Sequence, residues 1–90
     1  MTIDPLPPGW VGDATRIRRT FRFATFPRAL AFMVEVGYRC EAMNHHPDWK
    51  NVHDRIEVEL TTHDVGRVTA RDLDLAAHMN AVHARYAADG

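Results

Sequence analysis

One short stretch of the chain carries three ionisable side chains, Glu41, His45 and His46, and a fourth, His63, follows further on. An unperturbed histidine ionises near pH 6.5, so neutral and charged forms coexist near neutrality. Two or three histidines around one site can therefore supply both a general acid and a general base. Pro47 disfavours helix at the residue before it, which places the histidine pair in a loop. Spacing alone only suggests acid–base chemistry, because single surface histidines are common.

A metal site is the main alternative use of His45, His46 and His63. Zinc sites hold three or four ligands, usually with Cys, Asp or Glu among them. Two adjacent histidines rarely reach one ion, and Cys40, the only cysteine, is not spaced as a partner. We therefore expect these histidines to work without a metal ion.

Strands and helices must position the loops that carry the histidines, and the first of these elements is expected to be a hairpin. After a proline-rich, irregular arm at residues 1–9, a short strand is expected at residues 10–11. Residues 16–23 alternate between apolar and polar types, which predicts a strand with one buried face. That face carries Ile17, Phe21 and Phe23, with Arg19 interrupting it.

A helix over residues 26–43 is expected next. Thr25 can cap it, and Pro27 is tolerated in its first turn. Gly37 costs about 0.8–1 kcal/mol relative to alanine inside a helix, which predicts close packing there. The helical spacing is followed by Leu30, Met33, Val34, Gly37 and Glu41.

Two strands and a second helix complete the chain. Residues 49–53 are expected to form a short strand, with a turn at residues 54–55. Residues 56–60 alternate and predict a half-buried strand. A helix over residues 70–87 then carries one apolar stripe, made of Leu75, Met79, Val82 and Tyr86. The order predicts one α+β domain over residues 1–90, a four-stranded antiparallel sheet with helices packed on one face.

The length and net charge of the chain limit the partners and assemblies that we expect. A 90-residue chain buries only about 60–65% of its unfolded surface, so association into a homo-oligomer would add stability. The net charge of −1 favours neither nucleic acid nor membrane as a partner. Five arginines at residues 16–28 are therefore expected to be a solvated strand face. The lone cysteine, and the lack of a signal peptide or long apolar run, predict a cytoplasmic protein.

The residues of the histidine region resemble one known family, the pterin-4a-carbinolamine dehydratases. The pattern is Glu, three residues, His-His-Pro, one residue, Trp, and a later Thr-His, and few unrelated sequences would carry it by chance. The similarity runs from about residue 9 to residue 77. The segments that carry it are Glu41-Ala-Met-Asn-His45-His46-Pro47-Asp-Trp49, Asn51-Val52, Thr61-Thr62-His63-Asp64 and Arg71-Asp72-Leu73.

The resemblance implies an enzyme, a lyase that dehydrates 4a-hydroxytetrahydropterin to quinonoid dihydropterin in tetrahydrobiopterin recycling. His45 and His63 occupy the positions of its acid–base histidines, and His46 that of a histidine that binds and polarises the ring. Glu41 and Asp72 match acids near the site. The resemblance also implies a dimer or tetramer, with an aromatic amino-acid hydroxylase as the source of the pterin substrate.

Some site residues have simpler explanations. Thr69-Ala-Arg-Asp72 matches a helix capping box, which would explain Asp72 fully. Trp49 is expected to pack, although it can also wall the pterin site with Pro47 beside it. His53 is expected to be structural, and His78 and His83 to face solvent. A catalytically weak interaction or dimerisation module is the alternative function, which the intact histidine set disfavours. Members of the family often begin with another helix, whereas only a short arm is expected here before residues 9–10.

Overall fold

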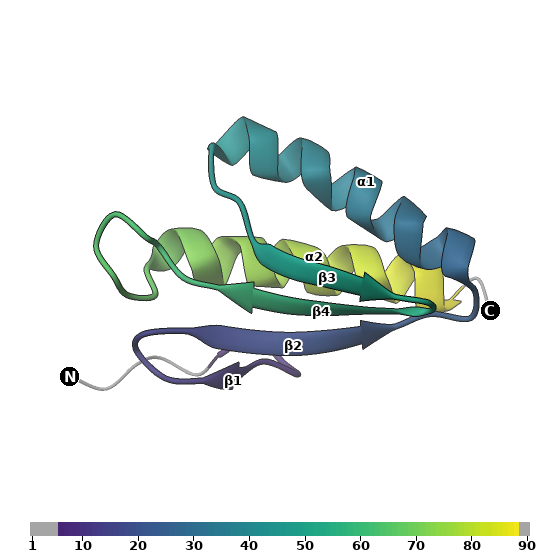
Figure 1. The fold of residues 1–90 in the computed structure, drawn as a ribbon, viewed down its shortest axis with the longest axis horizontal. Helices are drawn as coiled ribbons and strands as arrows, with labels where there is room; N and C mark the ends of the chain where they lie inside the picture. Colours follow the sequence, from purple (N-terminus) through teal and green to yellow (C-terminus); the bar gives the residue numbers. More distant parts are fainter. Residues whose placement is uncertain (1–5, 89–90) are drawn as a thin grey trace.

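The structure, a computed structural model, describes residues 6–88 and has the predicted α+β architecture. The elements are β1 (Val11–Gly12), β2 (Ile17–Arg22), α1 (Phe26–Met43), β3 (Asp48–Val52), β4 (Arg55–Leu60) and α2 (Ala70–Ala88). Figure 1 shows both helices against the sheet, with α1 and α2 side by side. Residues 6–9 contain no strand or helix, as expected of the arm, and residues 1–5 lie outside the described part.

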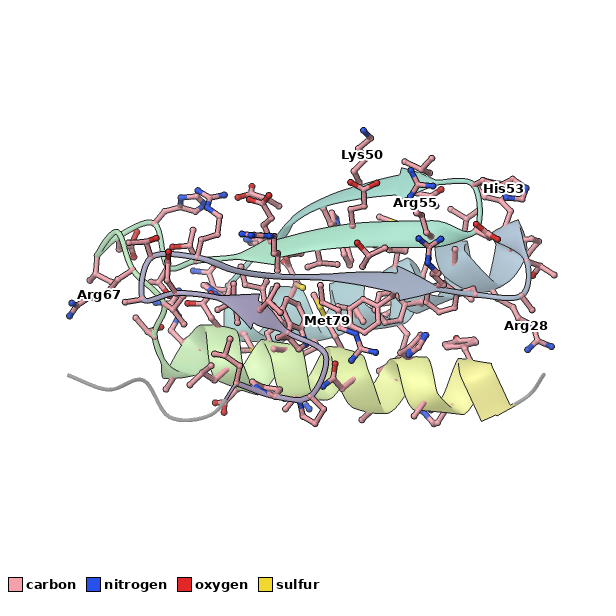
Figure 2. All side chains as sticks on the ribbon, turned by 90° about the horizontal axis from the view of Figure 1, so that it is seen from below. Arg28, Lys50, His53, Arg55, Arg67 and Met79 are labelled. Carbon is pink, nitrogen blue, oxygen red and sulfur yellow. The ribbon has the colours of Figure 1, made fainter. Side chains whose placement is uncertain are left out.

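The four strands form one antiparallel sheet in the order β1-β2-β4-β3. Strands β2 and β4 occupy the centre, where Ile17 pairs with Leu60 and Phe21 with Ile56. Because side chains alternate along a strand, this register places the apolar residues of both strands on the helix-covered face. The neighbouring positions leave a charged face open on the other side, from which Lys50 projects in Figure 2.

Helix α2 buries the stripe that its sequence predicts. Leu75, Met79 and Val82 are buried and Tyr86 packs against them in part. Figure 2 shows Met79 between α2 and the sheet. A fully buried aliphatic side chain contributes about 1.5–3 kcal/mol, so this stripe is a large part of what holds α2 in place.

Helix α1 has the predicted bounds and N-cap, because Arg28 N donates to Thr25 Oγ1 at 3.3 Å. The predicted stripe is wrong in part: Met33 packs against the core, whereas Leu30 and Val34 are exposed. The close packing predicted at Gly37 is also wrong, since a Cβ added there would meet no atom within 4 Å. The buried face consists instead of Ala29, Phe32, Val36 and Cys40. Each of these residues comes one position before a member of the predicted stripe.

Two other sequence predictions need correction. The β3–β4 turn comes one residue earlier than expected, because His53 adopts a left-handed conformation (φ 53°) and Arg55 already belongs to β4. The arginine stretch is not one solvated face. Arg19 points inward, lies over the Phe21 ring at 4.5 Å and donates to the Pro8 carbonyl at 2.9 Å.

Candidate active site

The end of α1 turns His45 into the protein interior. Asn44 ends the helix in a left-handed conformation (φ 51°, ψ 45°), which asparagine tolerates well. The backbone N–H of His45 then donates to the Cys40 carbonyl at 3.0 Å, so the chain reverses beneath the last turn. The His45 side chain is only 5% exposed as a result. Pro47, two residues later, cannot continue the helix.

The start of α2 supplies a buried carboxylate. The backbone N–H of Thr69 donates to Asp72 Oδ2 at 2.9 Å, and Arg71 N donates to Thr69 Oγ1 at 3.3 Å. These bonds confirm the predicted capping box. The Asp72 side chain is completely buried. A carboxylate in the first turn is also stabilised by the helix dipole.

His45 and Asp72 meet between these two helix ends. His45 Nε2 lies 2.6 Å from Asp72 Oδ1, and Thr62 Oγ1 donates to Asp72 Oδ2 at 2.7 Å. The other ring nitrogen of His45, Nδ1, lies 3.2 Å from Arg71 Nη2. The capping box therefore does not explain Asp72 fully. The same carboxylate starts α2 and holds the imidazole of His45.

His63 lies on the loop that follows β4. Thr62 N donates to the Arg67 carbonyl at 3.0 Å and Gly66 N to the Thr62 carbonyl at 2.9 Å, which closes a tight loop around His63. Gly66 adopts a positive φ of 66°, a conformation that glycine accepts without strain. His63 Nε2 lies 3.6 Å from Asp48 Oδ2, so the His63 loop reaches the start of β3. Figure 1 shows this loop, the start of β3 and the start of α2 at one end of the molecule.

The other predicted site residues surround the same loop but make looser contacts. His46 Nε2 lies 3.9 Å from Glu41 Oε1, and both side chains are exposed to solvent. Trp49 is partly buried against the core, and Pro47 is also partly buried. His45 is thus the fixed member of the set, whereas His46 and His63 are exposed and free to adjust.

An open hollow of about 540 Å³ lies over the uncovered face of the sheet. Its lining includes Asp48 and Trp49 together with charged residues of both signs, among them Arg18, Lys50 and Glu57. None of the three candidate histidines lines it. We place the chemistry at the histidines, because the buried pair of His45 and Asp72 is there and neither residue lines the hollow.

The remaining histidines lie outside this site, although two predictions about them are wrong. His83 is only partly exposed: its ring lies 5.0 Å from that of Phe21, and its Nε2 donates to the Arg22 carbonyl at 2.9 Å. His78 is half-buried, with no partner for its Nε2 within the described residues. His53 is at the opposite end of the molecule from the loop of Arg67 (Figure 2), and its ring stacks on that of Phe26.

Thr62 and Arg71 belong to the site, and neither received a role from the sequence. Both stand in the segments that resemble the dehydratases, beside His63 and Asp72 respectively. Their contacts cross from one element to another, because Thr62 and Asp72 are 10 positions apart in the sequence and Arg71 and His45 are 26 positions apart. Only the arrangement of the helix ends in space reveals these pairs.

The site is suited to proton transfer. A neutral imidazole whose far nitrogen is held by a carboxylate can accept a proton, since the carboxylate stabilises the cation that forms. Cys40 is buried beneath it, and burial raises the pKa of its thiol, so it is unsuited to act as a nucleophile. Within residues 6–88, no three His, Cys, Asp or Glu side chains come together as a metal centre requires. Neither described helix carries an apolar stretch that can cross a membrane.

Comparison with known proteins finds one family. Residues 2–82 match the model of the family described as Pterin 4 alpha carbinolamine dehydratase. A protein of Rhodopseudomonas palustris (strain BisB18) is 51% identical over 80 residues, 87% of this chain and 79% of the relative. One of Opitutus terrae is 48% identical over 69 residues, 76% of this chain and 71% of the relative. Both carry the name "Putative pterin-4-alpha-carbinolamine dehydratase".

Solved structures share the fold. The crystal structure of a "transcriptional coactivator/pterin dehydratase" from Brucella melitensis superposes with a TM-score of 0.80 at 37% identity, over 84% of this chain and 83% of that one. A pterin dehydratase-like protein described as a RuBisCO assembly factor of the alpha-carboxysome has a TM-score of 0.68 at 16% identity, over 82% of this chain and 86% of its own. The second likeness shows the fold alone.

Proposed function

Because this chain belongs to the pterin-4a-carbinolamine dehydratase family, we propose that it is a hydro-lyase that converts 4a-hydroxytetrahydropterin to quinonoid dihydropterin. The observation that carries the proposal is the buried pair of His45 and Asp72, 2.6 Å apart, beside the exposed His63 loop. A buried imidazole with a carboxylate on one nitrogen is an arrangement for moving protons, and dehydration requires two proton transfers.

The reaction breaks the bond between C4a and its hydroxyl oxygen. Hydroxide leaves poorly, so an imidazolium donates a proton and the group departs as water. The lone pair of the neighbouring ring nitrogen forms the new double bond to C4a, and a base removes the hydrogen of that nitrogen. We assign these two transfers to His45 and His63, which come from different loops at one end of the molecule. Such transfers contribute about 10²–10⁴-fold in rate.

The remaining candidate residues bind and orient the substrate. We assign to His46 the binding and polarisation of the pterin ring, and to Glu41 the orientation of His46, which lies 3.9 Å away. The partly buried Trp49 and Pro47 would form apolar walls for a planar heterocycle. Asp72, fully buried, would act through His45 and not touch the substrate. The reaction needs no metal or other cofactor.

The decisive experiment is a dehydratase assay on synthetic 4a-hydroxytetrahydropterin, compared with its spontaneous dehydration. We expect the protein to accelerate the reaction well above this background, and the His45→Ala/His63→Ala double variant to lose most of the gain. A protein that serves only as an interaction or dimerisation module would leave the background rate unchanged. That result would sink the proposed activity in favour of a partner-binding role.

We also propose a cytoplasmic homo-oligomer, either dimer or tetramer, that works in tetrahydrobiopterin recycling with an aromatic amino-acid hydroxylase as its source of substrate. The support for association is an apolar stripe on the outer side of α1, whose residues are four apart and between 40% and 76% exposed. The stripe consists of Phe26, Leu30, Val34 and Tyr38.

Light scattering at micromolar concentration tests the association. We expect a mass of two or four chains for the native sequence. The Val34→Arg variant should shift the mass toward one chain, because a charge in an apolar interface is costly. Val65→Arg, at an equally exposed valine of the His63 loop, is the matched control. A native chain that is only monomeric contradicts this prediction.

A further inference from the structure

The hydrogen bonds around Asp72 determine where each shared hydrogen lies. The backbone N–H of Thr69 can only donate, and it donates to Asp72 Oδ2. The Thr62 hydroxyl donates to the same oxygen at 2.7 Å. Because the hydroxyl hydrogen of Thr62 is already used in this bond, Thr62 can only accept in its contact of 2.7 Å with Thr69 Oγ1. The hydroxyl of Thr69 must therefore be the donor there. Asp72 Oδ2 therefore acts as an acceptor in both of its contacts.

The same reasoning fixes the hydrogen on His45. His45 Nε2 lies 2.6 Å from Asp72 Oδ1, and which of the two atoms donates depends on the ring tautomer. A guanidinium has donors and no acceptor, so Arg71 Nη2 at 3.2 Å must donate to His45 Nδ1. The Nδ1 atom therefore carries no hydrogen. The ring hydrogen is therefore on Nε2, which donates to Asp72 Oδ1, and the lone pair is on the nitrogen that faces Arg71.

The two hydrogen-bond partners of His45 differ in how easily a ligand can replace them. Asp72 is completely buried and accepts three hydrogen bonds, two of them from Thr62 and Thr69. Arg71 is exposed, and its guanidinium holds the ring through one contact at the longer distance of 3.2 Å. A ligand can replace the guanidinium at low cost, whereas replacing Asp72 would leave buried donors without an acceptor.

We propose that Arg71 is a positioning residue that holds His45 in its Nε2–H tautomer from the side opposite Asp72, and that the substrate takes the place of the guanidinium at Nδ1. The inference rests on the proposed function only for the identity of that substrate. It assigns the chemistry of His45 to Nδ1 and leaves Nε2 permanently bound to Asp72.

The tautomer can be measured without any activity. In ¹⁵N-labelled protein at neutral pH, long-range ¹H–¹⁵N correlation spectra should show His45 with a protonated Nε2 and an unprotonated Nδ1. Addition of 6-methyltetrahydropterin should shift the Nδ1 resonance and leave Nε2 nearly unchanged. A hydrogen on Nδ1 in the free protein, or a pterin that shifts Nε2 instead, overturns the assignment.

The Asp72→Asn variant tests whether the network sets the tautomer. The backbone N–H of Thr69 still requires an acceptor, so the amide oxygen should face Thr69 and the amide NH₂ should face His45. Nε2 must then accept, and the hydrogen should move to Nδ1, where it opposes the donors of Arg71. We expect the ¹⁵N shifts of the two ring nitrogens to exchange their character. A hydrogen that stays on Nε2 contradicts the proposed network.

Kinetics of Arg71→Met separate positioning from simple substrate binding. Without the guanidinium, the pterin no longer has to displace a donor from Nδ1, and Asp72 still holds the ring, so we expect KM to fall several-fold with kcat nearly unchanged. Arg67→Met is the matched control, an exposed arginine near the start of the same helix, and should change neither constant. A rise in KM with unchanged kcat would make Arg71 a substrate-binding residue and overturn the proposal. If the native protein has no dehydratase activity, the proposed function fails, and the tautomer spectra still decide the positioning role.

Discussion

An oriented histidine lies at each end of α2, His45 against its first turn and His83 toward its last turns. Comparing the two shows which surroundings suit a histidine to acid–base catalysis. At the first turn, His45 has Asp72 on one ring nitrogen and Arg71 on the other. Toward the last turns, His83 donates to the Arg22 carbonyl and lies 5.0 Å and 5.1 Å from the rings of Phe21 and Phe23. Both rings are oriented, but only His45 has a carboxylate that stabilises the positive charge of an added proton.

The two ends also differ in what holds them together. The His45 end is held by directed hydrogen bonds among residues of three separate segments, the loop after α1, the loop after β4 and the start of α2. The His83 end is held by packed aromatic rings, with centroids 4.9 Å apart for Phe21 and Phe32. We expect substitutions at the first end to affect catalysis most and substitutions at the second to affect stability.

The largest effect is expected for the His45→Ala/His63→Ala double variant. It removes both proposed acid–base groups, so kcat should fall by about 10²–10⁴-fold. Because the two residues come from different loops, each single variant should impair one stereoisomer of the 4a-hydroxypterin more than the other. Steady-state kinetics with each stereoisomer measure this. His83→Ala, at the other end of α2, should keep kcat in the folded protein, and a folded double variant with native kcat would show that His45 and His63 are not the acid and base.

The Phe21→Ala variant examines the aromatic end. Phe21 is fully buried and contacts the rings of Trp10, Phe32 and His83, so its truncation should lower the free energy of unfolding by about 3–5 kcal/mol. Denaturant unfolding measures the change. Val65→Ala, on an exposed loop, should stay within about 0.5 kcal/mol of the native protein. A small loss at Phe21 would mean that the aromatic cluster does not stabilise this end.

A smaller effect is expected at His46. Its side chain is 64% exposed and its contact with Glu41 is 3.9 Å, so it adds little to stability. His46→Ala should raise KM several-fold with a modest change in kcat, because its proposed role is to bind the ring. Equal losses in kcat and kcat/KM would instead make His46 a third acid–base residue.

The sequence predicted the elements well because their signals are local. The alternation of residues 56–60 and the stripe of α2 reflect periods of two and about 3.6 residues, which depend on the neighbouring chain only. The buried face of α1 was misjudged because apolar residues lie on both sides of that helix. Leu30 and Val34 have the same character as Phe32 and Val36, and only the packing of the sheet selects between them.

The site was predicted in its residues but not in its contacts. His45, His63 and Asp72 were identified from a pattern, whereas the hydrogen bonds of Thr62 and Arg71 depend on where three chain segments meet. A capping box is a local motif and was found, but its second function, holding His45, joins residues 27 positions apart. No periodicity in the sequence encodes such a contact.

The smallest predicted effect concerns His78, which lies on α2 between the two ends. Its Nε2 atom is buried with no hydrogen-bond partner within the described residues. Burial, and secondarily the positive charge of Arg39, lower the pKa of His78 from its ordinary value. The ring has neither the carboxylate of His45 nor the carbonyl of His83, so the folded protein favours its neutral form.

The sign of the pH dependence follows from this lowered pKa. The unfolded chain takes up a proton on His78 as the pH falls through about 6.5, while the folded protein still resists it. The contribution of His78 is therefore fully present above that pH and is lost as the pH falls toward the folded pKa. One proton changes the slope by at most about 1.4 kcal/mol per pH unit, and the partial exposure of the ring makes the real value smaller. Denaturant unfolding between about pH 5 and 8 should give a flatter profile for His78→Leu than for the native protein, whereas His53→Leu, at a histidine whose side chain is 79% exposed, should follow the native profile. Equal slopes for the native protein and His78→Leu would mean that the His78 ring takes up its proton as readily in the folded protein as in the unfolded chain.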